Sequence, residues 1–192
     1  EPYTNMNPII KAFKAIRYLG PTKLWFYALY RFGLFTGHFR RLTPSKRAIF
    51  SGETDLPPYK DFPTINSTQR TQLIDEADQI LKGKVSFFGT HQVPLDITAG
   101  ASNKHWSTLE KIPPNKDIKF IWEPGRFGWA VTLARAYAHS GKEIYAEVFW
   151  KKTLAFLEVH PPNLGRQWQS AQEVAIRLMV LVFCDRVFAH AP

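Results

Sequence analysis

Apolar residues recur every three or four positions along most of the chain, and this spacing is typical of one helical face. Between Pro21 and Gly33 the repeating positions are Leu24, Trp25, Ala28, Leu29 and Phe32. Pro21 suits the first position of this helix, because the amide hydrogen that proline lacks has no partner at a helix start. A shorter basic helix is predicted before it, from Pro8 to Arg17, because Gly20 and Pro21 stop it.

The same spacing predicts two helices further along. The first begins at Asn66 or Ser67, either of which is a good N-cap, and ends at Gly83. Its apolar face is formed by Leu73, Ile74, Ala77, Ile80 and Leu81. The next begins at Phe127 and is broken at Gly141, with an inner face of Ala130, Leu133, Ala134 and Tyr137.

Two more helices follow, and each has a candidate capping box, in which a serine at the helix start lies three residues before a glutamate. Ser140 and Glu143 have this spacing for a helix that ends near residue 160, and Ser170 and Glu173 have it for one that ends near residue 188. The last helix is apolar almost all round, which predicts neighbours on most of its sides. Because the chain stops just after it, we expect a fragment of a longer protein.

The remaining segments have no clear period. Residues 43–66 are rich in proline and are predicted to form an extended connection. Residues 84–118 are irregular, with a short strand at Val85–Gly89 and with loops that hold His91, His105 and Trp106. Short connections between the later helices favour antiparallel neighbours. We therefore expect one mainly α domain, with a basic helical region (1–42), the extended segment and helical hairpins (67–192).

The charge of the chain is positive and unevenly placed. The net charge is +9, and residues 1–50 hold nine Lys and Arg against one acid, Glu1. Such a basic block attracts an anionic partner, for example nucleic acid, anionic lipid or an acidic polysaccharide. The alternative is a solvated positive surface with no partner. Aromatic residues make up 15% of the chain, more than a small core needs, and exposed rings can stack on ligands.

Several absences narrow the class of protein. The single cysteine, Cys184, excludes an internal disulfide framework. No uninterrupted apolar run reaches the length of a membrane span. The sequence has no Gly-rich phosphate loop, no HExxH, no paired cysteines and no GxSxG, which disfavours a nucleotide enzyme, a zinc enzyme and a serine hydrolase. We predict no metal and no cofactor.

The first candidate site lies in residues 117–129, DIKFIWEPGRFGW. Glu123 and Arg126 stand at the start of a predicted helix, flanked by Trp122, Phe127 and Trp129. A carboxylate and a guanidinium framed by indole rings suit a sugar, because aromatic faces pack on its C–H surfaces while the charged pair holds hydroxyl or acidic groups. The alternative is an Arg–Glu pair that locks a helix start beside core tryptophans.

The second candidate site is the segment 161–187, PPNLGRQWQSAQEVAIRLMVLVFCDRV. It contains a well-formed helix start, because Arg177 follows Glu173 by four residues and such a pair stabilises a helix. Trp168 then packs against the apolar run. The other interpretation is that Trp168 and Arg177 also border a groove.

These two segments, in this order, resemble the N-terminal region of heparinase II/III-type polysaccharide lyases. The family pattern D-x-K-x-x-W-E-x-x-R-F is matched by Asp117, Lys119, Trp122, Glu123, Arg126 and Phe127. The pattern N-P-P-x-x-G-x-N-W-x-S-x-x-E-V-A-x-R is matched by Pro161, Pro162, Gly165, Trp168, Ser170, Glu173, Val174, Ala175 and Arg177. Gly83–Gly89 and His105-Trp106 are similar to the preceding family segment, so the resemblance covers roughly residues 80–185. His160 and Gln167 stand where the family has asparagine.

The resemblance implies an incomplete toroid of α/α hairpins followed by a β-sandwich, and cleavage of uronic-acid-containing polysaccharides by β-elimination. The family's catalytic asparagine, histidines and tyrosine come from later in the toroid and from the β-sandwich. We therefore assign no catalytic residue and expect this chain alone to be inactive. The residues expected to line the sugar cleft are His105, Trp106, Glu123, Arg126, Trp168 and Arg177. Both arginines are expected to face sulfate or carboxylate groups, and such a substrate implies an extracellular or periplasmic location.

Two other classes of function remain open. One is a non-catalytic helical scaffold or carbohydrate-binding module. The other is a membrane-surface or nucleic-acid binder that acts through residues 1–50, where the helix at 8–18 is basic and partly amphipathic. The partners we expect are an acidic polysaccharide and the missing C-terminal toroid and β-sandwich of the same chain. The surface binder ranks last of the three functions: a membrane is not the expected partner, and no nucleic acid is expected.

Overall fold

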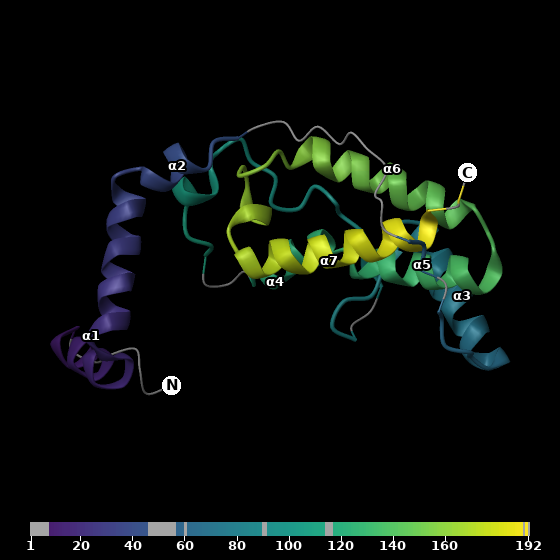
Figure 1. The fold of residues 1–192 in the computed structure, drawn as a ribbon, viewed down its shortest axis with the longest axis horizontal. Coiled ribbons are helices and arrows are strands. Elements are labelled where there is room, and N and C mark those ends of the chain that lie inside the picture. The colour runs from purple at the N-terminus through teal and green to yellow at the C-terminus, as the bar shows by residue number, and fades with distance from the viewer. Residues whose placement is uncertain are drawn as a thin grey trace. The chain divides into compact units, whose positions relative to one another are not determined.

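The computed structural model describes residues 8–45, 57–59, 61–89, 92–113, 117–189 and 191, without the side chains of residues 8–15. Most of these residues lie in helices, which confirms the mainly α prediction (Figure 1). The chain divides into two compact units, Glu1–Pro44 and Ser45–Pro192. In the described part of the chain, no helix is both long and apolar enough to cross a membrane.

The described part of the first unit contains α1 (Pro8–Phe35) and α2 (His38–Leu42). Gly20 interrupts α1 with φ 75° and ψ 161°, a conformation that glycine adopts readily, so Pro21 starts a second helical segment as predicted. The short helix α2 was not predicted. It packs on α1 because Gly33 has no side chain: a Cβ there would lie 2.8 Å from the ring of Phe39.

The second unit is built on α3 (Ser67–Leu81), α5 (Gly128–Ser140), α6 (Ile144–Val159) and α7 (Ala171–Phe188). Helix α5 lies at the centre and contacts the other three. Arg126 and Glu173 join the starts of α5 and α7, and Tyr137 packs on Phe188 at their ends, so these two helices are parallel. Phe156, late in α6, packs on Phe127 just before α5, so α6 runs in the opposite direction.

The predicted inner faces meet between these helices. The core includes the fully buried side chains of Phe127, Leu133, Tyr145, Phe149, Phe156 and Cys184. Tyr145 donates a hydrogen bond from its hydroxyl to Asp78 Oδ1 at 2.8 Å, which links α6 to α3. Burial of Cys184 raises the pKa of its thiol, because the thiolate would be poorly solvated there.

Three local predictions can be compared with the structure. The cap at Asn66 is confirmed, because its side chain accepts a hydrogen bond from the Gln69 amide at 2.8 Å. The capping box at Ser140 is wrong: its hydroxyl donates to the Ala136 carbonyl at 2.6 Å, and α6 begins without a side-chain cap. The strand is shorter than predicted. Strand β1 (Lys84–Val85) pairs antiparallel with β2 (Val93–Pro94), and the chain leaves it before Phe88.

The extended segment is described only in part. Residues 57–59 and 61–66 contain no helix or strand, in agreement with the prediction, and the rest of 46–60 and His91 lie outside the described residues. The segment 84–118 contains one 3₁₀ turn, η1 (Trp106–Thr108), in its described part. Helix α4 (Lys119–Trp122) and the 3₁₀ turns η2 (Glu123–Arg126) and η3 (Arg166–Trp168) precede the starts of α5 and α7.

Candidate functional site

The two sequence motifs meet where η2 leads into α5 and η3 leads towards α7. Pro124 lies in the first turn of η2, where its missing amide hydrogen costs nothing. Phe127 connects η2 to α5 with φ 63°, a left-handed conformation that is uncommon for a bulky residue. Its side chain is fully buried, so core packing holds this backbone geometry. The turn places Arg126 towards the start of α7.

Arg126 is held between two carboxylates. Its Nε and Nη2 donate to Glu173 Oε2 and Oε1 at 2.5 and 2.8 Å, and its Nη1 donates to Glu123 Oε2 at 2.6 Å. A two-pronged guanidinium–carboxylate contact of this kind is strong and geometrically specific. The hydrogen bond to Glu173, aided by the charge of Glu123, raises the pKa of Arg126 above its usual range.

Arg177 is buried, and its side chain contacts protein atoms. Its Nε donates to the Gly125 carbonyl at 2.6 Å, and its Nη2 donates to the carbonyl and the side-chain oxygen of Gln167 at 3.0 and 3.1 Å. Its guanidinium carbon lies 4.8 Å from the ring centre of Phe156 and 5.5 Å from that of Trp168. Burial lowers the pKa of Arg177 to about 10, an effect that the charge of Glu173 opposes.

The charge of Glu173 raises the pKa of Arg177, in agreement with the predicted helical pair, but no ion pair forms between these two residues. Glu173 is engaged by Arg126 instead, because η2 brings a second arginine to the same carboxylate. The serine cap of α7 is confirmed, with Ser170 Oγ accepting from the Glu173 amide at 3.4 Å. The Glu173 side chain therefore links two motif segments rather than closing a capping box within one.

Gln167 joins the two motifs, and the sequence analysis did not single it out as a site residue. It is buried, and its Nε2 donates to the carbonyls of Ala99 and Ile121 at 3.0 and 2.7 Å. A Cβ at Gly125 would lie only 2.1 Å from its Oε1, so the glycine makes the close approach possible. The one signal in the sequence was that a glutamine stands where the family has asparagine.

His160 is the second buried polar residue that the sequence analysis did not assign. Its Nε2 lies 2.8 Å from the Ile97 carbonyl, which can only accept, so Nε2 carries the hydrogen. Burial lowers the pKa of His160, because the protonated ring would be poorly solvated. Its own carbonyl accepts from Trp168 Nε1 at 3.3 Å, which positions the half-buried indole.

The predicted pair His105-Trp106 lies beside the second motif. His105 forms an isolated antiparallel bridge with Leu164, and the Trp106 amide donates to the Asn163 carbonyl at 3.0 Å. His105 is buried, while Trp106 is half-buried. The six predicted site residues therefore belong to one connected set of neighbouring segments, although their role in sugar binding stays a prediction.

The charges of this set cancel. Arg126 and Arg177 are balanced by Glu123 and Glu173, and both arginines already have protein acceptors. Beside Glu123 lies a hollow of about 160 Å³, which is also lined by Glu76, Gln79, Lys84, Gln92 and Thr132. With two carboxylates and one ammonium, this hollow suits hydroxyl groups better than an acidic group.

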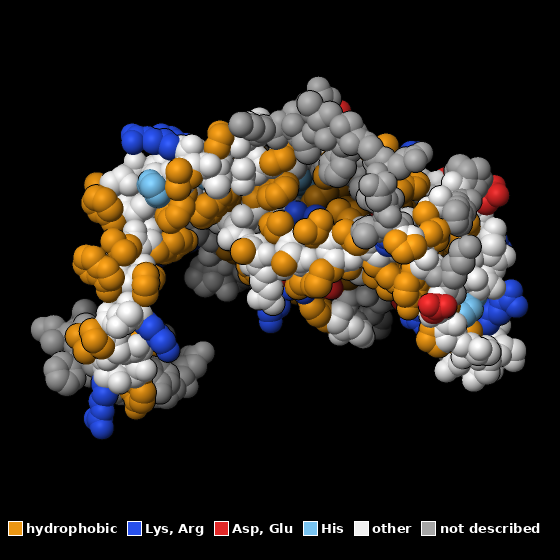
Figure 2. All heavy atoms as spheres, viewed as in Figure 1, with side chains coloured by type: hydrophobic (Ala, Val, Ile, Leu, Met, Phe, Trp, Pro, Cys, Tyr) orange, Lys and Arg blue, Asp and Glu red, His pale blue; other side chains and the backbone are white. Residues whose placement is uncertain are grey.

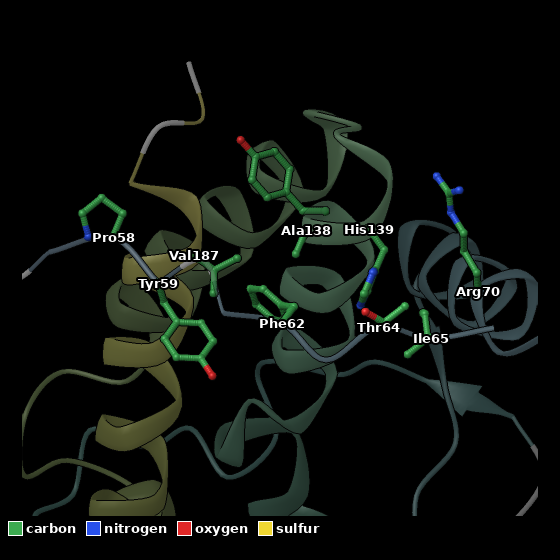
Figure 3. A pocket seen from close by; sticks show the side chains of 10 residues that line it. Pro58, Tyr59, Phe62, Thr64, Ile65, Arg70, Ala138, His139 and Val187 are labelled. Carbon is green, nitrogen blue, oxygen red and sulfur yellow. The ribbon is translucent and has the colours of Figure 1, made fainter. Parts of the chain in front are cut away.

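A larger groove lies at the opposite ends of α5 and α7. It has a volume of about 540 Å³, and Phe62 lies between Tyr59 and His139, with Arg70 at one end (Figure 3). The Phe62 ring meets those of Tyr59 and His139 edge-on, with centres 5.2 and 6.0 Å apart. Its residues come from the extended segment, the start of α3 and the ends of α5 and α7, a combination that no local sequence pattern indicates.

Comparisons with known proteins identified no related protein. No family model, no curated protein and no solved structure matched this chain. The resemblance to heparinase II/III-type lyases therefore depends on the motif residues themselves. The described residues also contain no group of three or more His, Cys, Asp or Glu that could hold a metal ion.

Proposed function

We propose that this chain is the N-terminal helical part of a lyase of the heparinase II/III type, which cleaves acidic polysaccharides. The observation that carries the proposal is the link between the two motif segments. Arg126 of the first bonds Glu173 of the second, and Arg177 of the second bonds the Gly125 carbonyl of the first. Motif residues about fifty positions apart thus depend on one another, which supports a shared architecture behind the resemblance.

The direction of the helices supports the toroid part of this proposal. Residues 65–70 lie beside 137–139, and residues 76–80 lie beside 128–132, so α3 is antiparallel to α5. Helices α3, α5, α6 and α7 thus alternate in direction. Repeated hairpins of this kind are the unit of an α/α toroid, and we propose that these helices are its first members.

The proposed reaction needs groups that we do not assign in this chain. In β-elimination a base removes the C5 proton of a uronic acid, its carboxylate is neutralised, and the glycosidic oxygen departs with a proton. Because Arg126 and Arg177 are engaged with protein acceptors, we propose that they hold the two motif segments together. Contact with the sugar then falls to the more accessible groups, namely the rings of Trp106 and Trp168 and the carboxylate of Glu123.

Affinity electrophoresis of this chain tests the proposal. Gels would contain heparan sulfate, alginate, chondroitin sulfate or neutral dextran. Because residues 16–45 are basic and attract any polyanion, the background is a variant in which Lys23, Arg31, Arg40 and Arg41 are changed to Gln. We expect retardation by at least one acidic polysaccharide and none by dextran. The double variant Trp106→Ala/Trp168→Ala should lower that affinity about fivefold, or about 1 kcal/mol.

The matched control is Trp150→Ala, which removes a partly exposed indole on α6. Its affinity should equal that of the background. The proposal would be contradicted if the double variant were retarded as strongly as the background variant. It would also be contradicted if no acidic polysaccharide retarded the background variant. Unsaturated uronate released by this chain alone would contradict the expectation that it is inactive without further residues.

A further inference from the structure

The first unit exposes large aromatic side chains. Along the second segment of α1 they include Trp25, Phe26, Tyr27, Phe32 and Phe35, which are between 60% and 89% exposed. Hydrophobic side chains gather along this helix, with basic ones among them (Figure 2). Apolar surface of this extent on a soluble protein marks a binding surface, because water contact with it is unfavourable.

These rings surround the helix instead of forming one stripe. Trp25, Phe26 and Tyr27 are consecutive, and successive helical residues point about 100° apart. A helix that packs on one protein neighbour has an apolar stripe and a polar opposite face. From Leu24 to Phe35, by contrast, the only charged residue is Arg31. Rings on several sides of a helix are better covered by a surrounding apolar medium than by one flat protein surface.

The segment is too short to span a bilayer. Twelve helical residues extend about 18 Å, whereas a hydrocarbon core is about 30 Å thick. Between α1 and α2 lies a hollow of about 510 Å³, lined by Leu29, Tyr30, Phe32, Thr36, His38 and Phe39. Its mainly apolar lining extends the exposed apolar surface into a recess, which is suited to inserted acyl chains.

The positive charges around these rings indicate the chemistry of the surface that they bind. No Asp or Glu occurs from position 2 to position 52, whereas nine Lys and Arg do. Lys23 precedes the apolar run, and Arg40 and Arg41 follow it. Among the described side chains of residues 16–45, no cation forms an ion pair within the unit. The cations at both ends of the run are available to anionic groups.

We infer that residues 16–45 bind the surface of a membrane that contains anionic lipids. Tryptophan and tyrosine rings favour the boundary between headgroups and acyl chains, and flanking Lys and Arg side chains reach the phosphates. The second segment of α1 inserts to this depth with rings on several of its sides, whereas an interfacial helix with one apolar stripe buries only that face. A soluble polyanion would neutralise the cations and stack on rings of one side of the helix. A lipid surface also covers the rings of the other sides and the apolar recess, so it accounts for both features.

Vesicle flotation of the chain tests this inference. Vesicles would contain phosphatidylcholine with or without phosphatidylglycerol, and we expect binding to depend on phosphatidylglycerol and to weaken with salt. The variant Trp25→Ser/Phe26→Ser/Tyr27→Ser should lower binding about tenfold or more. The matched control Trp150→Ser/Leu154→Ser/Leu178→Ser removes exposed apolar residues of the second unit and should bind as the unchanged chain does.

Quenching by brominated phospholipids locates the contact. Trp25 is the only tryptophan in residues 16–45, so Trp25→Phe should abolish the quenching and leave flotation nearly unchanged. Circular dichroism checks that the variants remain helical. No binding to anionic vesicles, binding that survives the triple serine variant, or quenching that survives Trp25→Phe would each overturn the inference.

The result is separable from the proposed function. Polysaccharide binding through Trp106 and Trp168 is measured without lipid and should be unaffected by the triple serine variant. The alternative partner for the exposed rings is a second copy of the chain. Analytical sedimentation distinguishes the two. If the unchanged chain is a dimer, the triple serine variant is a monomer and neither binds vesicles, the second copy and not a lipid surface covers the rings.

Discussion

Arginines and aromatic rings lie close together in two regions of this molecule, and the two regions use them differently. At the start of α7, Arg177 is buried beside Phe156 and Trp168 and donates three hydrogen bonds to Gly125 and Gln167. In the second segment of α1, Arg31 and the rings around it are exposed. The same residue types connect two buried segments at the start of α7 and form a solvent-exposed surface on α1.

The difference lies in the acceptors available to the cations. The second unit supplies acceptors to Arg126 and Arg177: the Glu173 carboxylate to the first, and the carbonyls of Gly125 and Gln167 to the second. Positions 2–52 contain no Asp or Glu, so their cations have no carboxylate within this segment to pair with. An arginine beside aromatic residues is therefore not by itself a sign of ligand binding. What decides its role is whether the fold brings it an acceptor.

The largest effect is expected from breaking the Arg126 link. Arg126→Met removes the partner of Glu173, whose side chain is only 5% exposed, and leaves its carboxylate buried without a counter-charge. We expect a loss of about 3–5 kcal/mol in the free energy of unfolding, measured by urea denaturation. The control is Lys104→Met, which removes an exposed ion pair with Glu110 and should cost less than about 1 kcal/mol. Equal losses in the two variants would contradict the difference between buried and exposed pairs.

The close approach of Gly125 to Gln167 gives the next largest effect. A methyl group at Gly125 would overlap the Gln167 amide, so Gly125→Ala should cost about 1–3 kcal/mol. Gly128→Ala is the matched control three residues later, because a Cβ there meets nothing within 4 Å. We expect it to leave stability unchanged or slightly higher, since alanine favours helix. A neutral Gly125→Ala would mean that the link between the motifs can rearrange.

The sequence predicted the helices well because their signals are local. Spacing of apolar residues and the cap at Asn66 placed α3, and Ser170 placed the start of α7. The partner of Glu173 could not be found in this way. A pair four residues apart on a helix is a local pattern, whereas the contact with Arg126 spans 47 positions and depends on how η2 turns. For the same reason the burial of Arg177 and the contacts of Gln167, which also depend on segments far apart in the sequence, were not foreseen.

Acid should weaken the second unit through His160. Its pKa is lowered in the folded chain, so below about pH 6.5 the unfolded chain binds a proton that the folded chain does not. Stability should therefore fall with decreasing pH, by at most about 1.4 kcal/mol per pH unit for one proton. Urea denaturation between about pH 7 and pH 5 measures this slope. His160→Gln keeps a donor for the Ile97 carbonyl and should flatten it, whereas His139→Gln should not. An unchanged slope in His160→Gln would assign the acid sensitivity to another group.

The smallest effect should come from the exposed rings of the first unit. The side chain of Trp25 is 62% exposed, so its removal takes little from the packed interior. We expect Trp25→Ser to change the free energy of unfolding by no more than about 0.5 kcal/mol in the absence of lipid, as for most surface substitutions. The same urea titration as for Arg126→Met gives the value. A loss above about 1 kcal/mol that depends on protein concentration would mean that the ring is covered by another copy in solution. The aromatic residues at the start of α7 would then be covered within one chain, and those of α1 by a second copy. The rings of the second segment of α1 would in that case not be accessible to a membrane.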